Sequence, residues 1–309
     1  MNSKVKEIFV YNGILNVYKE AGFTSHDVVA KLRGILKQKK IGHTGTLDPD
    51  AVGVLPVCLG VGTKLCEFLT DKTKEYVAVL QLGVKTDTQD LSGRVLETSP
   101  VEVTEEQIRE TVSAFIGEIP QIPPMYSALK VDGKRLYELA REGKEVEIKA
   151  RPVMIYEIEI QEISLPYVTM RVKCGKGTYI RTLCQDIGEK LGCLGAMKQL
   201  TRTRSGVFTI DQALTLSQIE QLRDAGTIES WIVPVDKVFA DYPAVGILPQ
   251  FRKLIDNGNA FAAQHCETRE EIPDGTEVRV YRDDDLFCGI YRKEGALYKP
   301  VKMFLSTSM

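Results

Sequence analysis

Residues 42–53 read Gly42-His43-Thr44-Gly45-Thr46-Leu47-Asp48-Pro49-Asp50-Ala51-Val52-Gly53, so a histidine, two aspartates and three glycines fall within twelve residues. Glycine lets the backbone turn where a Cβ would clash and lets a ligand approach the main chain, so such loops often carry chemistry. A plain connection between a helix and a strand would use the same residue types, with the aspartates serving turn geometry. The apolar run that follows, residues 54–59, predicts a buried strand that would hold the carboxylates rigidly.

The first eight residues of this stretch, 42–49, resemble the signature of the TruB-type pseudouridine synthases. Members of this family isomerise uridine 55 in the T-arm loop of transfer RNA. The resemblance implies that Asp48 is the catalytic aspartate, because the family places that residue directly before a proline. Spacing alone does not rank Asp48 above Asp50.

A second block, Gly175-Lys176-Gly177-Thr178-Tyr179-Ile180-Arg181-Thr182-Leu183, is similar to the family's G-T-Y-I-R motif. An arginine near the start of a helix is usually a surface residue. The resemblance instead implies that Arg181 pairs with Asp48 and keeps the carboxylate ionised and oriented. Tyr179, in the same motif, is expected to contact the substrate.

Three further positions gain a role only from the resemblance. Tyr76 opens a predicted strand, where an aromatic side chain is normally part of the core, but the family uses it to stack on the flipped base and in proton removal. His43 would help to hold the RNA loop with its base extruded. Leu200, in Met197-Lys198-Gln199-Leu200-Thr201-Arg202, would pack against the pocket, which is nearly the same as an ordinary core role.

The segment Val17-Tyr18-Lys19-Glu20-Ala21-Gly22-Phe23-Thr24-Ser25 resembles the family's first motif and makes Lys19 a candidate substrate-binding residue. In the family this lysine is commonly followed by proline, whereas here Glu20 follows it. The turn is therefore less rigid, and the placement of Lys19 is less well defined. Residues 123–130 also match the family and are expected to contribute to RNA contact.

The conversion of uridine to pseudouridine is a redox-neutral isomerisation, so the resemblance implies no cofactor and no metal. The sequence contains no P-loop, no dinucleotide fingerprint and no H-E-x-x-H motif. The reaction needs a carboxylate, a base to remove the C5 proton and a pocket for an extruded nucleotide. Sequence leaves open whether the aspartate attacks the base, attacks the ribose or assists elimination.

The net charge of −2 excludes a global polycation, because residues 1–240 carry 31 basic and 31 acidic side chains and residues 241–309 carry 9 and 11. RNA binding must then come from local patches. Three clusters are candidates for a phosphate track, although any one of them is more often plain solvated surface: Lys37/Lys39/Lys40, Lys173/Lys176/Arg181 and Lys198/Arg202/Arg204.

The seven cysteines are odd in number and form no C-x-x-C pair, which indicates core residues in a reducing compartment. Residues 1–18 lack the apolar core of a signal peptide, and no apolar run is long enough to cross a bilayer. We therefore expect a cytoplasmic monomer that binds tRNA and no membrane.

Hydrophobic patterning predicts strands at 13–18, 54–59, 76–83, 153–163 and 168–174, with helices at 104–115, 134–142 and 178–191 and one opened by Ser25 as its cap. Residues 126–133 are expected to form a hairpin-like segment, and the prolines in 119–124 exclude regular structure there. Mixed elements without βαβ alternation favour an α+β class with a mixed or antiparallel central sheet flanked by helices.

A junction near 232–243 separates two predicted domains. Residues 1–240 would form the pseudouridine synthase catalytic domain. Residues 241–309, with a helix at 249–257 and strands at 277–282, 286–292 and 295–304, would form a small β-rich domain similar to the PUA type of RNA-binding domain.

Two other functions compete with the isomerisation of uridine 55 in tRNA that the resemblance implies. A non-catalytic tRNA-binding or tRNA-folding protein would keep the scaffold, but the presence of Asp48, Tyr76 and Arg181 disfavours it. An aspartate-dependent hydrolase could use Asp48 and Asp50 as a carboxylate pair, and it would differ from an isomerase by releasing the base.

Overall fold

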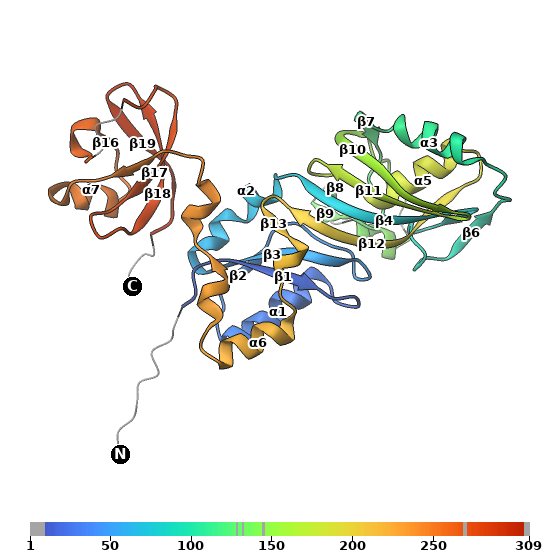
Figure 1. Cartoon of the computed structure of the whole chain (residues 1–309), viewed down its shortest axis with the longest axis horizontal. Coiled ribbons are helices and arrows are strands. Elements are labelled where there is room, and N and C mark those ends of the chain that lie inside the picture. Colours follow the sequence, from blue (N-terminus) through green and yellow to red (C-terminus); the bar gives the residue numbers. More distant parts are fainter. Residues whose placement is uncertain (1–9, 128, 132, 144–145, 268–270, 306–309) are drawn as a thin grey trace, which may run out of the picture.

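The computed structural model of the chain describes residues 10–127, 129–131, 133–143, 146–267 and 271–305. A ten-stranded sheet runs through the larger part of the molecule, with the main order β14-β1-β3-β12-β4-β11-β10-β7 (Figure 1). Strands β3 and β12 pair in parallel, and the other neighbours on this path are antiparallel. The predicted α+β class with a mixed central sheet is confirmed.

The strands of this sheet are β1 (Gly13–Lys19), β2 (Ile41–His43), β3 (Val52–Leu59), β4 (Lys74–Leu82), β7 (Gly117–Gln121), β10 (Arg151–Ser164), β11 (Tyr167–Cys174), β12 (Gly195–Ser205), β13 (Phe208–Thr209) and β14 (Ile232–Val233). Two short hairpins lie outside it: β5 (Val84–Thr86) with β6 (Val95–Thr98), and β8 (Lys130–Val131) with β9 (Lys134–Arg135). Strand β8 lies in the predicted hairpin-like segment 126–133, of which residues 128 and 132 lie outside the described part. Strand β9 lies just after this segment, in the first two residues of the predicted helix 134–142, and the helix itself begins at Leu136.

Helices cover the sheet in two groups. The helices α1 (Ser25–Leu36) and α6 (Leu216–Asp224) share one apolar cluster with β1 and β3. The helices α3 (Glu105–Ser113) and α5 (Ile180–Lys190) share a second cluster with β4, β11 and β12. Shorter helices are α2 (Cys66–Thr70) and α4 (Leu136–Arg141).

The predicted cap of α1 is wrong by one residue. Thr24 is the N-cap, and its side chain accepts a hydrogen bond from the backbone N–H of Asp27 while the Asp27 carboxylate accepts one from the Thr24 N–H. This reciprocal pair satisfies two free donors at the helix start. Ser25 is therefore released for another contact, described below.

The proline-rich segment 119–124 also departs from its prediction, because Ile119 and Pro120 belong to β7. This strand is the last one in the sheet order and pairs with β10 alone. A proline that cannot donate a hydrogen bond is tolerated on an edge strand, where one side of the backbone has no partner.

Strand β12 was missing from the sequence-based prediction, although it lies between β3 and β4 near the middle of the sheet. Its sequence, GAMKQLTRTRS, mixes lysine and arginine with few apolar residues. Neighbouring strands on both sides and tertiary burial stabilise this segment, and neither signal can be read locally.

The C-terminal strands form a separate five-stranded sheet of order β15-β17-β18-β19-β16, seen as a lobe at one end of the molecule (Figure 1). They are β15 (Ala244–Gly246), β16 (Phe261–Ala262), β17 (Glu277–Tyr281), β18 (Phe287–Glu294) and β19 (Leu297–Met303), with the helix α7 (Arg252–Asp256). Phe304 of this lobe packs on Phe239 with ring centroids 6.1 Å apart, and the Tyr281 hydroxyl donates a hydrogen bond to Asp236 at 2.9 Å. The lobe is thus docked through both apolar and polar contacts.

Candidate active site

The loop that carries Asp48 connects β2 to β3 and is held in place from the side of β1 and α1. The Ser25 hydroxyl accepts a hydrogen bond from the backbone N–H of Leu47 at 3.0 Å. The Lys19 ammonium donates to the carbonyls of Pro49 at 2.8 Å and Ala51 at 2.6 Å. The loop backbone is therefore fixed on both sides of Asp48 by buried polar groups.

Lys19 was expected to bind the substrate, but its side chain is 0% exposed. Its third hydrogen bond goes to the carbonyl of Glu20 at 3.2 Å, so all three ammonium donors are used within the protein. The structure therefore places Lys19 behind the loop, with its ammonium shielded from solvent.

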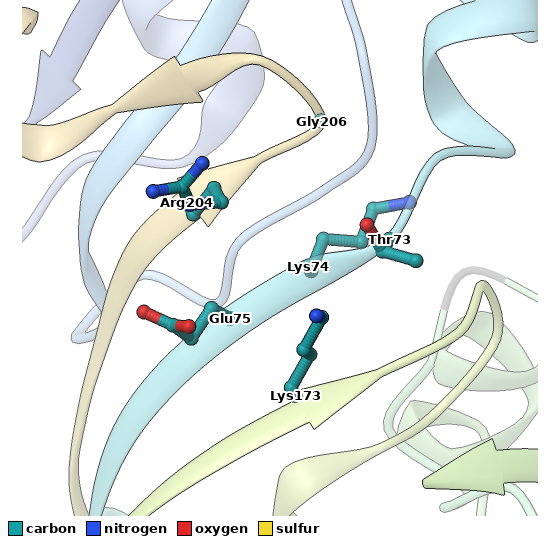
Figure 2. Close-up of a pocket in the computed structure, with 6 residues that line it drawn as sticks. All are labelled: Thr73, Lys74, Glu75, Lys173, Arg204 and Gly206. Carbon is teal, nitrogen blue, oxygen red and sulfur yellow. The ribbon is translucent and has the colours of Figure 1, made fainter. Parts of the chain in front are cut away.

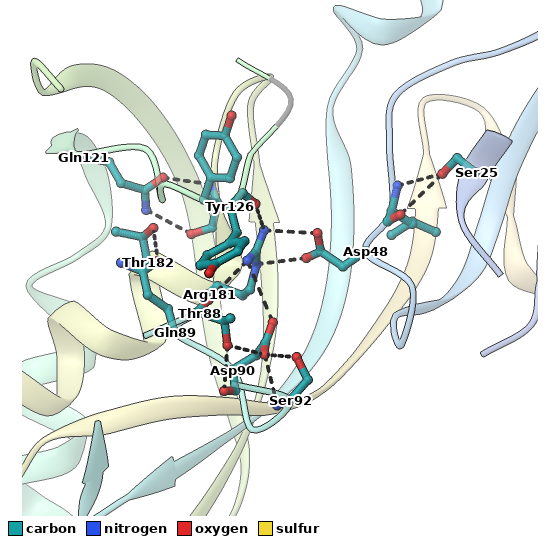
Figure 3. Close-up of polar contacts among 12 residues, drawn as sticks. Ser25, Asp48, Thr88, Gln89, Asp90, Ser92, Gln121, Tyr126, Arg181 and Thr182 are labelled. Carbon is teal, nitrogen blue, oxygen red and sulfur yellow. Dashed lines mark hydrogen bonds and ion pairs between the residues drawn. The ribbon is translucent and has the colours of Figure 1, made fainter. Parts of the chain in front are cut away.

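Arg181 and Asp48 form a two-pronged ion pair (Figure 3). The Nε of Arg181 lies 2.9 Å from Asp48 Oδ2, and its Nη2 donates to Asp48 Oδ1 at 3.0 Å. The Arg181 side chain is 6% exposed, whereas that of Asp48 is 34% exposed. The carboxylate is thus oriented from inside the protein and open to solvent on its other side, as a group that meets a substrate must be.

The remaining donors of Arg181 reach two carbonyls of neighbouring loops, Thr88 O at 3.1 Å and Tyr126 O at 2.9 Å. Its helix, α5, begins directly after Tyr179, whose backbone is held by Gln121. The Gln121 amide donates to Tyr179 O at 3.0 Å and accepts from Tyr179 N at 2.7 Å. Tyr179 is therefore the N-cap of the helix that carries Arg181, and Gln121 fixes its backbone.

Asp90 is a second carboxylate beside Arg181, with its Oδ2 3.8 Å from Arg181 Nη1. Its other oxygen accepts hydrogen bonds from the Thr88 hydroxyl at 2.7 Å and the Ser92 hydroxyl at 2.6 Å (Figure 3). The sequence alone indicates no function for this residue. Nothing in the spacing of residues 87–93 distinguishes a carboxylate that faces the site from one that only shapes the turn.

Burial is the largest influence on the Asp48 carboxyl and raises its pKa, while the charge of Arg181 opposes that shift and the charge of Asp90 adds to it. For Lys19, burial lowers the pKa to about 8, although the charges of Asp48 and Asp50 favour the ammonium. Burial therefore disfavours the charge of the Asp48 carboxylate, and its arginine partner favours that charge.

Tyr76 and Leu200 lie in the same apolar cluster as Leu47, next to the Asp48 loop. Tyr76 and Leu200 are each 8% exposed. Burial raises the pKa of the Tyr76 hydroxyl, and the charge of Arg202 is the main opposing influence. The site therefore brings together the Asp48 carboxylate, the Arg181 guanidinium and the buried Tyr76 phenol beside one apolar cluster.

His43 ends β2, and its ring packs edge-on against His26 with centroids 5.1 Å apart. Burial lowers the pKa of His43, and the neighbouring His26 adds to the effect. Burial thus favours the neutral form of the His43 ring, which lies at the start of the loop.

Two of the three basic clusters contain a buried residue, Arg181 in one and Arg202 in the other. Of the rest, Lys176 pairs with Asp71 at 3.0 Å and Lys198 lies over the ring of Tyr167 at 3.7 Å. Lys173 and Arg204 stay exposed on either side of Glu75 in the sheet register. They line a cavity of about 370 Å³ with Thr73, Lys74, Glu75 and Gly206 (Figure 2).

Within the described ranges no group of three histidine, cysteine or acidic side chains is arranged to hold a metal ion. Among the helices of those same ranges, none has the length and apolar character needed to span a membrane.

The chain matches two family models. Residues 33–180 match the TruB family pseudouridylate synthase (N terminal domain), and residues 181–240 match the tRNA pseudouridylate synthase B C-terminal domain. Residues 241–309 lie outside both matches.

Curated relatives cover nearly the whole chain. It is 52% identical to the tRNA pseudouridine synthase B of Lachnoclostridium phytofermentans, over 95% of this chain and 100% of the relative. It is 46% identical to the protein of the same name from Alkaliphilus oremlandii, over 94% and 97%.

Solved structures with the same arrangement include a Cbf5-Nop10-Gar1 complex, 30% identical, with a TM-score of 0.71 over 95% of this chain and 85% of the matched chain. An H/ACA RNP bound to a substrate RNA containing 2'-deoxyuridine is 28% identical, with the same TM-score and the same coverage of both chains.

Proposed function

The chain belongs to the TruB family of pseudouridine synthases, which convert uridine in tRNA to pseudouridine, and from this premise we propose that its target is uridine 55 in the T-arm loop. The paired Asp48 and Arg181 are the observation that supports the proposal most strongly. Arg181 is buried and binds both oxygens of the partly exposed Asp48 carboxylate. This arrangement fits a site in which the carboxylate meets a substrate.

We assign the roles as follows. Asp48 does the covalent or electrostatic work at the glycosidic bond, and Arg181 keeps it ionised and aimed. Tyr76 stacks on the extruded base and takes part in removal of the C5 proton, while Leu200 closes the apolar side of the pocket. Extrusion of the base is required because the reacting atoms cannot be reached inside a folded RNA loop.

Around this centre, Tyr179 and His43 contact the RNA, and His43 does so as a neutral ring. Lys19 acts from behind, since its three donors hold the backbone on both sides of Asp48. We therefore replace direct substrate binding by Lys19 with positioning of the loop.

The exposed cations bind the RNA backbone in this proposal. Lys37, Lys39 and Lys40 form one such group, and Lys173 with Arg204 form another. RNA recognition would combine these phosphate contacts with the shape of a loop whose bases are splayed out.

Residues 241–309 act as a PUA-like RNA-binding domain, and residues 1–240 as the catalytic domain. The separate five-stranded sheet supports this division. The protein acts as a cytoplasmic monomer, and its unpaired cysteines fit a reducing compartment.

The target position is tested with two T-arm stem-loops, one natural and one with cytidine in place of uridine 55, followed by nucleoside analysis of the RNA. The proposal expects one pseudouridine per natural stem-loop and none in the cytidine variant. Pseudouridine in both RNAs would show that another uridine is the target. Tight binding without pseudouridine would favour the non-catalytic RNA-binding alternative.

A further inference from the structure

Arg202 is a buried cation that forms no ion pair with the described residues. Its side chain is 1% exposed and is the largest fully buried side chain of the described residues. Its Nε donates to the carbonyl of Val54 at 2.6 Å, but its Nη2 has no hydrogen-bond partner within the described ranges. No ion pair of Arg202 is found there either. Burial of an unpaired charge is costly, so a position that keeps one is a candidate for function.

Glycines of the 42–53 stretch make room for this side chain and its backbone. A Cβ on Gly53 would lie 2.3 Å from the Arg202 carbonyl oxygen, so only glycine lets β3 approach β12 there. Gly45 lies on the other side, where a Cβ would be 3.8 Å from Arg202 Nη1. Strand β3 and the loop that carries Asp48 thus both lie against Arg202.

Tyr76 is the functional residue beside Arg202. The two residues are direct partners in the register of β4 and β12, so their side chains leave the same face of the sheet. Both are buried. On that face β11 contributes Val172 opposite Tyr76, which offers no charge and no hydrogen bond.

The charged groups around the pair come from several elements. Near the Tyr76 hydroxyl are Arg202 from β12, Cys174 from β11 and Asp48 from the loop; only Arg202 favours the ionised phenolate, and burial is the largest opposing influence. The other groups that sense the charge of Arg202 include Lys19 of β1, Lys74 of β4, His43 of β2 and the Cys174 thiol of β11, and none of these four is a carboxylate. Negative charge on the phenol oxygen would therefore be the natural complement of this guanidinium.

We propose that Arg202 is a positioning residue for the isomerisation: its guanidinium orients the Tyr76 hydroxyl and stabilises the negative charge on that oxygen while it accepts the C5 proton. The inference rests on the proposed role of Tyr76. In the step, the phenolate oxygen takes the proton from C5 after C5 has bonded to the ribose. The C–H electron pair becomes the C5=C6 double bond, and the C6=N1 pair moves to N1, which takes a proton from water. The phenol then returns its proton to water, so no further reactant is needed.

The step can be isolated with tRNA that carries deuterium in place of hydrogen at C5. A variant that impairs only proton removal makes this step limiting and creates a primary isotope effect on single-turnover pseudouridine formation. We expect Arg202→Met to lower the rate about 100-fold or more, in line with the usual contribution of acid–base catalysis. We also expect a clear isotope effect, and a pH–rate profile displaced to higher pH. Arg202→Lys keeps the positive charge but lacks the planar guanidinium. Its rate should be at least tenfold higher than that of Arg202→Met.

A double-mutant cycle with Tyr76→Phe separates action through Tyr76 from a structural role. If Arg202 acts through the phenol, Arg202→Met causes no further loss of rate in the Tyr76→Phe background. Thermal unfolding serves as the control for folding. Loss of an unpaired buried charge should leave the melting temperature of Arg202→Met at or above that of the wild type.

The outcomes distinguish a failure of the proposed role of Tyr76 from a failure of the inference about Arg202. Full turnover by Tyr76→Phe would remove the role of Tyr76 and the inference together. An inactive Tyr76→Phe beside an Arg202→Met variant with normal rate, pH profile and isotope effect would overturn the inference alone. Additive losses in the double variant, or a lowered melting temperature with no isotope effect, would also overturn it in favour of a packing role.

Discussion

Arg181→Lys tests the two-pronged pair with Asp48 on which the proposed chemistry depends. A lysine is a point charge on a flexible stem and can keep one contact to the carboxylate, whereas Arg181 makes two, at 2.9 and 3.0 Å. A hydrogen bond to a charged group contributes about 1.5–3 kcal/mol, and each 1.36 kcal/mol changes a rate about tenfold. The variant should therefore lose about 10- to 150-fold in rate, before any effect of the carbonyls of Thr88 and Tyr126, which lose their donor.

The assay is single-turnover pseudouridine formation with enzyme in excess, so that product release does not enter the rate. The pH dependence gives a second readout. Burial raises the pKa of Asp48 and Arg181 opposes the shift, so a weaker partner raises that pKa further. The acidic limb of the rate profile should then move to higher pH, because Asp48 loses its proton only at a higher pH.

Arg171→Lys is the matched control. Arg171 pairs with Glu75, Glu157 and Glu159 on the face of the sheet opposite to α5, the helix that carries Arg181. It should keep the wild-type rate and pH profile. A rate for Arg181→Lys within about threefold of that of the control, with an unmoved acidic limb, would refute the pairing argument.

Three other variants follow from the same geometry. Lys19→Met should lower activity by loosening the loop. Because the Lys19 pKa is lowered to about 8 when folded, from 10.5, unfolding binds a proton between these values. The wild-type unfolding free energy should then rise relative to the variant by up to about 3 kcal/mol as pH increases through that window, measured by urea unfolding; a constant difference would contradict the buried-lysine argument. Tyr76→Phe should keep RNA affinity and lose turnover, and normal turnover would exclude proton transfer by the phenol. Replacing Lys173 and Arg204 together by glutamine should weaken binding and reduce the magnitude of the slope of log K against log salt by about 1.4–1.8; an unchanged slope would remove this cluster from the RNA interface.

Much of the fold could be predicted from local pattern. Strand β4 alternates buried and half-exposed residues, and the capping box of Thr104 and Gln107 opens α3 as predicted. Both signals are contained within a few residues. Strand β12 could not be found in this way, because its charged residues are accommodated only by neighbours that are distant in sequence.

The predicted site residues show the same division. The motif resemblance brought Asp48 and Arg181 forward, and the structure places them in contact. It could not show that Lys19 and Arg202 are buried, because a lysine or arginine read from sequence is by default a surface residue. Burial of these two cations depends on how β1, β3 and β12 pack beside the loop. The contacts of Gln121 with Tyr179 and of Asp90 with Arg181 likewise join residues that are distant in sequence.

In the proposed function Asp48 drives isomerisation of one uridine in tRNA, and release of the C5 hydrogen reports this reaction directly. An unmodified tRNA tritiated at uridine C5 would be incubated with the wild type and with Asp48→Asn, with tritium in water and free uracil both counted. The account predicts one equivalent of tritium per tRNA from the wild type, none from the variant, and no free uracil. Tritium release by Asp48→Asn at the wild-type rate, or free uracil from the wild type, would contradict it.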